Sequence, residues 1–398
     1  MKNLPQPHLN MARTGLEIKK HFENLWTHLS EATTPPDEEA TRYQHADLNA
    51  DSSGPDLVPV YRDFLHVPDW YQEFERAMDP RRPFRSLDPS MLYYGPGFAA
   101  NWININEGWE VYRQMQSKLE NNVGPPLLHV LDGDSINLVD LGVGDFQMAS
   151  HVLNLLLYDR PSRELNYIAI DISSDMLFYA LNLSQTGERW APLRELRRKG
   201  WAVRGVNTDF HHLEHCRSLF ASGRTVFLLL GNTLGNVLSE VTTLRRIGNA
   251  MASGDLMLVE VAVEEEEPFS ESDLTAQIQD SRSFWAGPFL SFGCPPDAVQ
   301  LRVSEVHGGM SKGNFAGVAY EVRCDFSRET VLVNPRFREG RIAVAPGSVT
   351  MFLVRKYRSD SVGDALQQAG FQVLERSVTP TRSPKERRSC CVLAEKRA

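Results

Sequence analysis

The sequence predicts an α/β fold, with a doubly wound, mostly parallel sheet and helices on both of its faces. Three observations support this prediction. From Asn137 onward, segments typical of strands and of helices alternate along the chain. All the expected strands of this region except the third are nearly continuous apolar runs, as required where both faces of a sheet are covered. The first strand is followed by two glycines in G-x-G spacing, at the edge where such sheets bind ligands.

The alternating region contains five expected strands, at 137–141, 167–171, 201–206, 225–230 and 255–262, and three helices, at 148–158, 175–183 and 240–251. After Glu264 the alternation is lost. A helix reaching Trp285 and alternating strands at 301–306, 318–326 and 329–333 predict a smaller antiparallel lobe that shares an edge with the main sheet. Late strands at 351–357 and 391–395, with a helix at 362–369 capped by Gly370 between them, return to the core.

The composition excludes several classes of partner. The 398 residues carry a formal net charge of −9, so the chain has no overall basic field to gather nucleic acid or an anionic membrane surface. Neither a signal peptide nor an apolar run of about 18 residues is visible. The five cysteines lack C-x-x-C spacing, which favours reduced thiols over a metal site or disulfides. We therefore expect a cytoplasmic protein.

The loop after the first strand has the character of a ligand-binding turn. Gly142 and Gly144 allow the backbone to turn sharply and to approach a ligand closely. Asp140, just before them, can hold a cationic or amino group. A dinucleotide loop would need a third glycine at position 147, where Gln147 stands, and this weighs against a nicotinamide cofactor and a dehydrogenase.

Polar residues also follow the next three strands. Asp171 can accept hydrogen bonds from the two hydroxyls of a ribose, Asp209 can accept one from an adenine amino group, and Phe210 can lie against the base. After the fourth strand come Gly231 and Asn232, in a glycine-containing polar loop. Because the carboxyl ends of parallel strands meet at one edge, these residues predict a single nucleoside site, which suits S-adenosyl-L-methionine.

The pattern resembles the histidine-specific methyltransferase superfamily, typified by the ergothioneine-pathway enzyme that methylates the α-amino group of histidine. The similarity runs through 139–260 and resumes more faintly at 349–395, and its most particular element is LLLGNTLGN, at 228–236. The resemblance implies a Rossmann-like class I methyltransferase core with a second, smaller α+β substrate-binding lobe, and S-adenosyl-L-methionine as cofactor. It also implies that Asn236 grips the substrate as the catalytic residue, and that Asp209 and Phe210 hold the adenine.

The departures from the family pattern concern the substrate. The family's late strand has Thr-Glu-x-Ser-x-Lys-Tyr, and alignment on Lys356 and Tyr357 places Phe352 and Val354 where its acidic and hydroxyl residues stand. An apolar pair cannot bond the nitrogens of an imidazole, which would cost about 1–3 kcal/mol for each nitrogen buried without a partner. The sequence therefore predicts a substrate other than histidine, with an apolar or aromatic distal end.

Further substrate contacts follow from the same resemblance. Tyr93 and Tyr94 echo the family's N-terminal tyrosine motif, and Tyr357 is a third candidate for orienting the substrate. Met148 stands where the family loop has lysine. Glu260, at the end of the fifth strand, can contact donor or substrate or form a structural salt bridge.

No metal is expected. The histidines at 211, 212 and 215 and the glutamates at 264–267 are interpreted as a solvated helix face and a solvated loop, because no further ligand accompanies them and methyl transfer needs no metal.

The expected organisation has five segments: an N-terminal helix with a mobile linker (1–59), a mainly helical part of the substrate lobe (60–136), the donor-binding core (137–263), an inserted α+β lobe (264–348) and terminal strands and helix that complete the core (349–398). The first segment is a possible site of homodimerisation.

The activity expected is methylation of a nitrogen in an amino acid, an amino-acid-derived small molecule or a peptide. Two alternatives stay open: transfer of an aminocarboxypropyl group from the same cofactor, and a methyltransferase fold used as a non-catalytic interaction module. The mass added to the product separates the first two.

Overall fold

The computed structural model describes residues 58, 60–62, 69–82, 84–95, 98–106, 122–131, 133, 135–183, 188–220, 222–264, 270–306, 317–378 and 388–397. Nearly all of the expected N-terminal segment 1–59, including its helix and its proposed dimer contact, lies outside these residues, as do the glutamates at 265–267.

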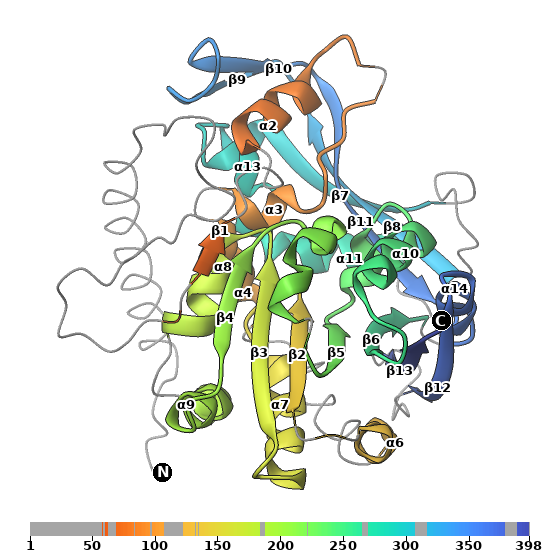
Figure 1. Ribbon diagram of the computed structural model, residues 1–398. Coiled ribbons are helices and arrows are strands. Elements are labelled where there is room, and N and C mark those ends of the chain that lie inside the picture. The colour runs from red at the N-terminus through yellow and green to blue at the C-terminus, as the bar shows by residue number, and fades with distance from the viewer. Residues whose placement is uncertain are drawn as a thin grey trace, which may run out of the picture.

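A parallel sheet forms the centre of the molecule (Figure 1). Its strands lie in the order β1 (Val60–Arg62), β4 (Val203–Asn207), β3 (Glu164–Asp171), β2 (Ser135–Leu141), β5 (Arg224–Leu229) and β6 (Leu256–Val263). Beyond β6 follow β13 (Arg388–Lys396) and β12 (Phe371–Val378), where β13 is antiparallel to both of its neighbours. The chain reverses the direction of strand order between β2 and β5, so the carboxyl ends of these strands border a crevice where doubly wound sheets bind ligands.

Helices cover both faces of this sheet, as the apolar strands require. One face packs against α6 (Gly124–Val130), α7 (Gln147–Asp159), α8 (Ser174–Phe178) and α9 (Ala191–Arg198). The other packs against the 3-10 segment η4 (Phe210–Leu219), α10 (Glu240–Ala250) and α14 (Ser361–Gln368). Strand β3 shows the alternation that produces two cores, since Tyr167 and Ala169 face the first set of helices whereas Ile168 and Ile170 face the second.

The second, smaller lobe is built on an antiparallel sheet of β7 (Val299–Glu305), β8 (Gly317–Phe326) and β11 (Gly347–Tyr357). This sheet joins the core sheet where Tyr357 of β11 pairs with Val263 of β6. Helices α2 (Trp70–Met78), α3 (Met91–Tyr94), α4 (Phe98–Asn106), α11 (Glu271–Gln279), α12 (Arg282–Trp285) and α13 (Gly287–Leu290) pack around it, and β9 (Thr330–Val333) and β10 (Arg341–Val344) form a separate pair. In Figure 1, the lobe lies across the carboxyl ends of the parallel strands.

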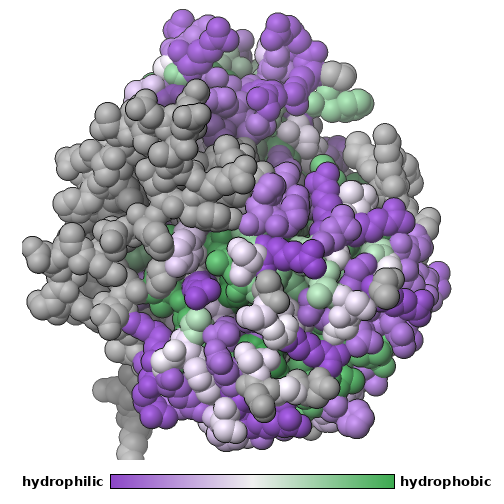
Figure 2. Space-filling view, viewed as in Figure 1, coloured by the Kyte–Doolittle hydropathy of each residue, from purple (hydrophilic) through white to green (hydrophobic). Residues whose placement is uncertain are grey.

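The expected α/β class and the shared edge between lobe and core are confirmed. Two elements need correction. The expected helix 175–183 is α8 followed by the π-helical turn η2 (Tyr179–Leu183). The late strand expected at 351–357 to complete the core pairs mainly with β8 of the lobe and meets the core sheet only at Tyr357. On the face shown in Figure 2, hydrophilic residues dominate the surface and hydrophobic ones show mainly in the recesses between them. Among the described residues there is no helix whose length and apolar character would let it span a membrane.

Candidate active site

A cavity of about 850 Å³ lies where the carboxyl ends of the core strands face the lobe. Its lining includes most of the residues predicted from the sequence to bind donor and substrate: Tyr93, Tyr94, Gly142, Gly144, Asp171, Asp209, Phe210, Gly231, Asn232, Asn236, Phe352 and Val354. The fold thus brings together residues separated by up to 261 positions in the chain, from Tyr93 to Val354. Two predicted site residues, Asp140 and Tyr357, do not line it.

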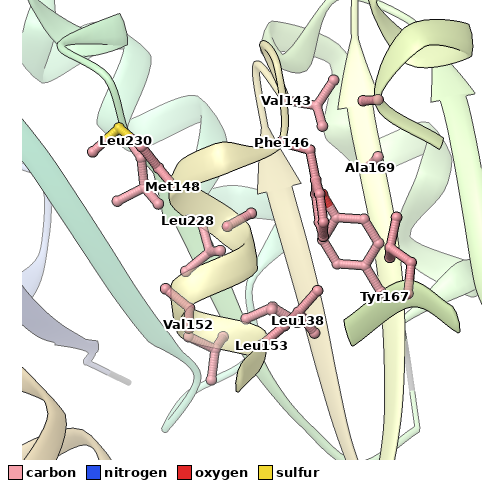
Figure 3. Packing of buried hydrophobic residues seen from close by; sticks show 14 of the residues in the cluster. Leu138, Val143, Phe146, Met148, Val152, Leu153, Tyr167, Ala169, Leu228 and Leu230 are labelled. Carbon is pink, nitrogen blue, oxygen red and sulfur yellow. The ribbon is translucent and has the colours of Figure 1, made fainter. Parts of the chain in front are cut away.

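The glycine loop between β2 and α7 has the sharp turn that its sequence predicts. Gly142 and Gly144 have φ of +75° and +54°, a region that L side chains rarely adopt. A Cβ at position 144 would also lie 3.0 Å from the Trp102 ring. Phe146, likewise left-handed, packs edge-to-face on Tyr167 with ring centroids 5.4 Å apart (Figure 3). Phe146 thus anchors the end of the loop in the hydrophobic core.

Asp171 ends β3 at the floor of the cavity. Its carboxylate accepts a hydrogen bond from the backbone N–H of Ser173 at 2.8 Å. Burial raises the pKa of Asp171 to about 6, although backbone N–H groups of Ser173, Gly144 and Val143 oppose the rise. Near neutral pH the group is thus a carboxylate with limited contact to water, which is suited to accept from a pair of ribose hydroxyls.

Asp209 caps the segment η4 and shares the cavity wall with Phe210 and His211. The ring of His211 lies 2.8 Å from the Asp209 carboxylate through Nδ1. Burial by itself raises the pKa of Asp209, but the hydrogen bonds and charge of His211 outweigh it, so the pKa lies below its usual value. The interpretation of His211 as part of a solvated helix face is therefore wrong, because this side chain lines the cavity and is bonded on both ring nitrogens.

The loop after β5 is fixed by the end of β6. Glu260 accepts hydrogen bonds from the backbone N–H groups of Gly231 and Asn232, at 3.0 and 3.3 Å. The Asn232 side chain accepts from the Ala262 N–H at 2.9 Å and donates to the Arg355 carbonyl. Glu260 thus supports the loop rather than forming the salt bridge considered from the sequence, and the amide of Asn232 is used to hold the loop in shape.

Asn236 ends this loop and lines the cavity. Its Oδ1 is buried, and it has no hydrogen-bond partner among the described residues. Buried amide oxygens in proteins are nearly always bonded, so an unpaired one at a cavity points to a group that a ligand supplies.

Aromatic side chains form the lobe's part of the cavity. Phe352 lies edge-to-face with Trp285 and with Tyr93, at centroid distances of 5.4 and 6.2 Å. Tyr93 in turn packs against Trp102 and Phe284. Burial raises the pKa of Tyr93, and the nearby Asp171 adds to this effect. Tyr93 therefore lies between the aromatic wall and Asp171. Trp102, Phe284 and Trp285 were not predicted as site residues, because nothing but their residue type singles them out in the sequence.

Two predicted contacts need correction. Asp140 lies beneath the glycine loop, where its carboxyl group accepts a hydrogen bond from Tyr167 at 2.6 Å and burial raises its pKa to about 7. Tyr357 donates its hydroxyl to the Leu234 carbonyl at 3.0 Å and lies near Glu240, on the opposite face of β11 from Phe352 and Val354. Both residues support the walls of the cavity from behind.

His212, Glu214 and His215 bring one ligand atom each to within 4.8 Å of one another. None of the three lines the cavity. The absence of a metal requirement stays a prediction.

The strand order, the glycine loop and the acidic residues at successive strand ends define an S-adenosylmethionine-dependent methyltransferase with a Rossmann-like class I core. Residues 110–268 match the model of the family described as histidine-specific methyltransferase, SAM-dependent. This match confirms the resemblance found in the sequence, the enzymatic class and the cofactor, S-adenosyl-L-methionine.

No curated protein matches the sequence. Solved structures similar to this chain include an S-adenosylmethionine-dependent methyltransferase from Clostridium acetobutylicum, with 10% identity, a TM-score of 0.37 and coverage of 74% of this chain and 95% of that one. The CcbJ methyltransferase from Streptomyces caelestis has 11% identity, a TM-score of 0.35 and coverage of 74% and 96%. The 1,6-didemethyltoxoflavin-N1-methyltransferase from Burkholderia thailandensis has 13% identity, a TM-score of 0.35 and coverage of 74% of this chain and 81% of that one.

Proposed function

We propose that the enzyme methylates a nitrogen atom of an amino acid, an amino-acid-derived small molecule or a peptide, and that this substrate is not histidine. The observation that carries the proposal is the unpaired Oδ1 of Asn236 in a cavity whose lobe wall includes the apolar side chains of Phe284, Phe352 and Val354. The first feature calls for a hydrogen-bond donor on the substrate, such as an amine. The second favours an apolar or aromatic group over a polar ring at the distal end.

The donor end of the cavity fits S-adenosyl-L-methionine. Gly142 and Gly144 line the cavity and carry no side chain, so a ligand can come close to the backbone of this loop. Asp171 offers acceptors for the ribose and Asp209 an acceptor for the adenine amino group, and Phe210 adds an aromatic surface for the base. Gly142, Gly231 and the backbone of Asn232 complete this proposed donor site.

The acceptor end fits an apolar or aromatic group. Phe352 and Val354 alternate with outward residues on β11 and face the cavity, close to the aromatic residues of α12. A histidine imidazole placed here would have no partner from these two side chains, at a cost of about 1–3 kcal/mol per unpaired nitrogen. An aromatic or aliphatic side chain would instead bury apolar surface favourably.

When bound, the cofactor supplies a sulfonium methyl group that a neutral amine takes by in-line displacement, with S-adenosylhomocysteine as the leaving group. The chain's own contribution is orientation. Asn236 accepts an N–H of the substrate nitrogen, which leaves the lone pair directed away from the amide, and Tyr93 and Tyr94 restrict the remaining polar groups. Positioning of this kind supplies several kcal/mol of the barrier reduction, and no general base has to act in the displacement. The proton released from the nitrogen passes to solvent.

The proposal is tested by calorimetric titration with S-adenosylmethionine and S-adenosylhomocysteine, followed by mass spectrometry of a mixed amino acid and peptide pool incubated with enzyme and donor. The expected result is a product heavier by one or more methyl groups from an acceptor with an apolar or aromatic end, and no turnover of free histidine. A product heavier by an aminocarboxypropyl group would replace methyl transfer with the alternative reaction. Absence of binding to either nucleoside would favour a non-catalytic module.

A further inference from the structure

His211 joins the proposed adenine contact to the helix behind it. Its Nδ1 lies 2.8 Å from Oδ1 of Asp209, and its Nε2 lies 2.9 Å from the hydroxyl of Thr243 on α10. The backbone N–H of His211 donates to the same Asp209 oxygen at 2.9 Å. Thr243 is itself buried, so the imidazole is anchored to a rigid part of the fold.

The chemistry of the three groups fixes one hydrogen. A carboxylate can only accept, so Nδ1 of His211 carries a hydrogen. Nε2 bonds the Thr243 hydroxyl in either charge state of the ring, accepting from it when the ring is neutral and donating to it when the ring is protonated. Both hydrogen bonds to Asp209 end on Oδ1, so that, within the described part of the chain, Oδ2 remains available to a ligand in the cavity.

We propose that His211 is a positioning residue for nucleobase recognition: anchored by Thr243, it holds Asp209 so that Oδ2 accepts from the exocyclic amino group of the donor's adenine. This inference rests on the proposed donor site. The new element is that His211 and Thr243, which hold Asp209, select a 6-amino purine over a 6-oxo purine. A 6-oxo group presents an acceptor to Oδ2 and is repelled by a carboxylate that cannot turn away.

The test measures two affinities in the full chain by calorimetry: for S-adenosylhomocysteine, and for S-inosylhomocysteine, its 6-oxo analogue. The native chain is expected to prefer the adenine compound. In His211→Ala, adenine affinity should fall about 10-fold, as for a lost bond to a charged group, while inosine affinity changes little, so that the preference largely disappears. His211→Asn, whose amide N–H can replace Nδ1–H, should restore most of the preference.

Two further variants separate positioning from general damage. Thr243→Val removes the anchoring hydroxyl at nearly constant volume, and it should lower the preference without removing Asp209. His215→Ala, on the same segment and half exposed, is the matched control and should leave both affinities unchanged.

Equal weakening of both compounds in His211→Ala and in Thr243→Val, or an unchanged preference in both, would overturn the role of His211 while leaving the donor site intact. Failure of the native chain to bind S-adenosylhomocysteine at all would instead overturn the donor site, and the inference with it.

Discussion

Arg355 on β11 forms a buried ion pair with Glu240 in the first turn of α10, with 3.2 Å between Nε and Oε1. The Nε–H of Arg355 is not aligned with Oε1 of Glu240 for a hydrogen bond, so this contact is an ion pair only. The guanidinium also donates to the backbone carbonyls of Val237 and Leu238. One cation therefore ties the chain just after Asn236 to the strand β11, which lines the cavity.

Replacement of this cation should uncouple the loop from the strand. We expect Arg355→Met to lower the free energy of unfolding by about 3–5 kcal/mol, because Glu240 is left buried without its partner charge. The double variant with Glu240→Gln should recover part of this loss, as chemical denaturation would show. If the two single changes were simply additive, the pair would not be coupled.

Stability should depend on pH through Asp140. Burial raises the pKa of this carboxyl from 3.8 to about 7, so the folded state holds a proton that the unfolded state releases. The associated stabilisation is fully present below pH 3.8 and is lost as the pH rises through 7. Asp140→Asn removes the titration and keeps an acceptor for Tyr167. Its stability relative to the native chain should therefore increase by about 2–4 kcal/mol from pH 4 to pH 8 in urea titrations. If the difference in unfolding free energy between Asp140→Asn and the native chain were the same at every pH in this range, the raised pKa of Asp140 would be contradicted.

Donor affinity should depend on the ionisation of Asp171. Since its pKa is about 6 in the free chain, S-adenosylhomocysteine should bind progressively more weakly as the pH falls below 6, when the carboxyl loses its charge. Asp171→Ala should weaken binding about 10-fold or more at neutral pH, the cost of a lost charge-assisted bond. Asp171→Asn serves as the non-titrating comparison, and its binding should be flat between pH 5 and about 7. An unchanged affinity in the alanine variant would mean that the ribose lies elsewhere.

Asn236 should affect the acceptor and not the donor. We expect Asn236→Ala to lower kcat/KM for the acceptor by about 10- to 100-fold, with donor affinity unchanged within about twofold. Asn236→Asp keeps an acceptor oxygen and should retain more activity than the alanine variant if the oxygen bonds the substrate amine. Steady-state kinetics and calorimetry together decide this. Parallel losses of donor and acceptor binding would indicate that the loop itself had moved.

Restoration of the family's polar pair should change acceptor selection. In the double variant Phe352→Glu and Val354→Ser, we expect methylation of histidine to rise about 10-fold or more over the native chain, while turnover of apolar acceptors falls. Val333→Ser, on an exposed strand of the same lobe, is the control for a polar change outside the cavity. Product analysis with equimolar acceptors measures the shift. No gain with histidine, in a variant that still binds the donor, would show that this wall does not select the acceptor.

The core and the half of the cavity at the strand ends were predictable because the parallel strands are apolar and their carboxyl ends meet at one edge. Edge strand β12 and helix α9 were missed, since the first is half-exposed with mixed residues and the second is a short helix with few apolar positions. The family motif placed Tyr357 in the site, and this was wrong. Because side chains alternate between the two faces of a strand, Tyr357 lies on the face opposite Val354, as the structure shows.

The aromatic wall and the His211–Thr243 contact were not predictable in the same way. Trp102 and Trp285 reach the cavity from helices far apart in the chain, and Thr243 meets His211 only because α10 packs on η4. Such contacts depend on how layers pack together, and no local pattern records them.

The two faces of β11 have separate duties. Phe352 and Val354 line the cavity, whereas Arg355 and Tyr357 donate hydrogen bonds to backbone carbonyls of the loop that carries Asn236. Substitutions at Phe352 and Val354 can therefore change acceptor specificity while Arg355 and Tyr357 still hold the Asn236 loop in place. An insertion of a single residue upstream would be far more damaging than any substitution, because it would swap the duties of the two faces, turning the guanidinium inward and the aromatic wall out.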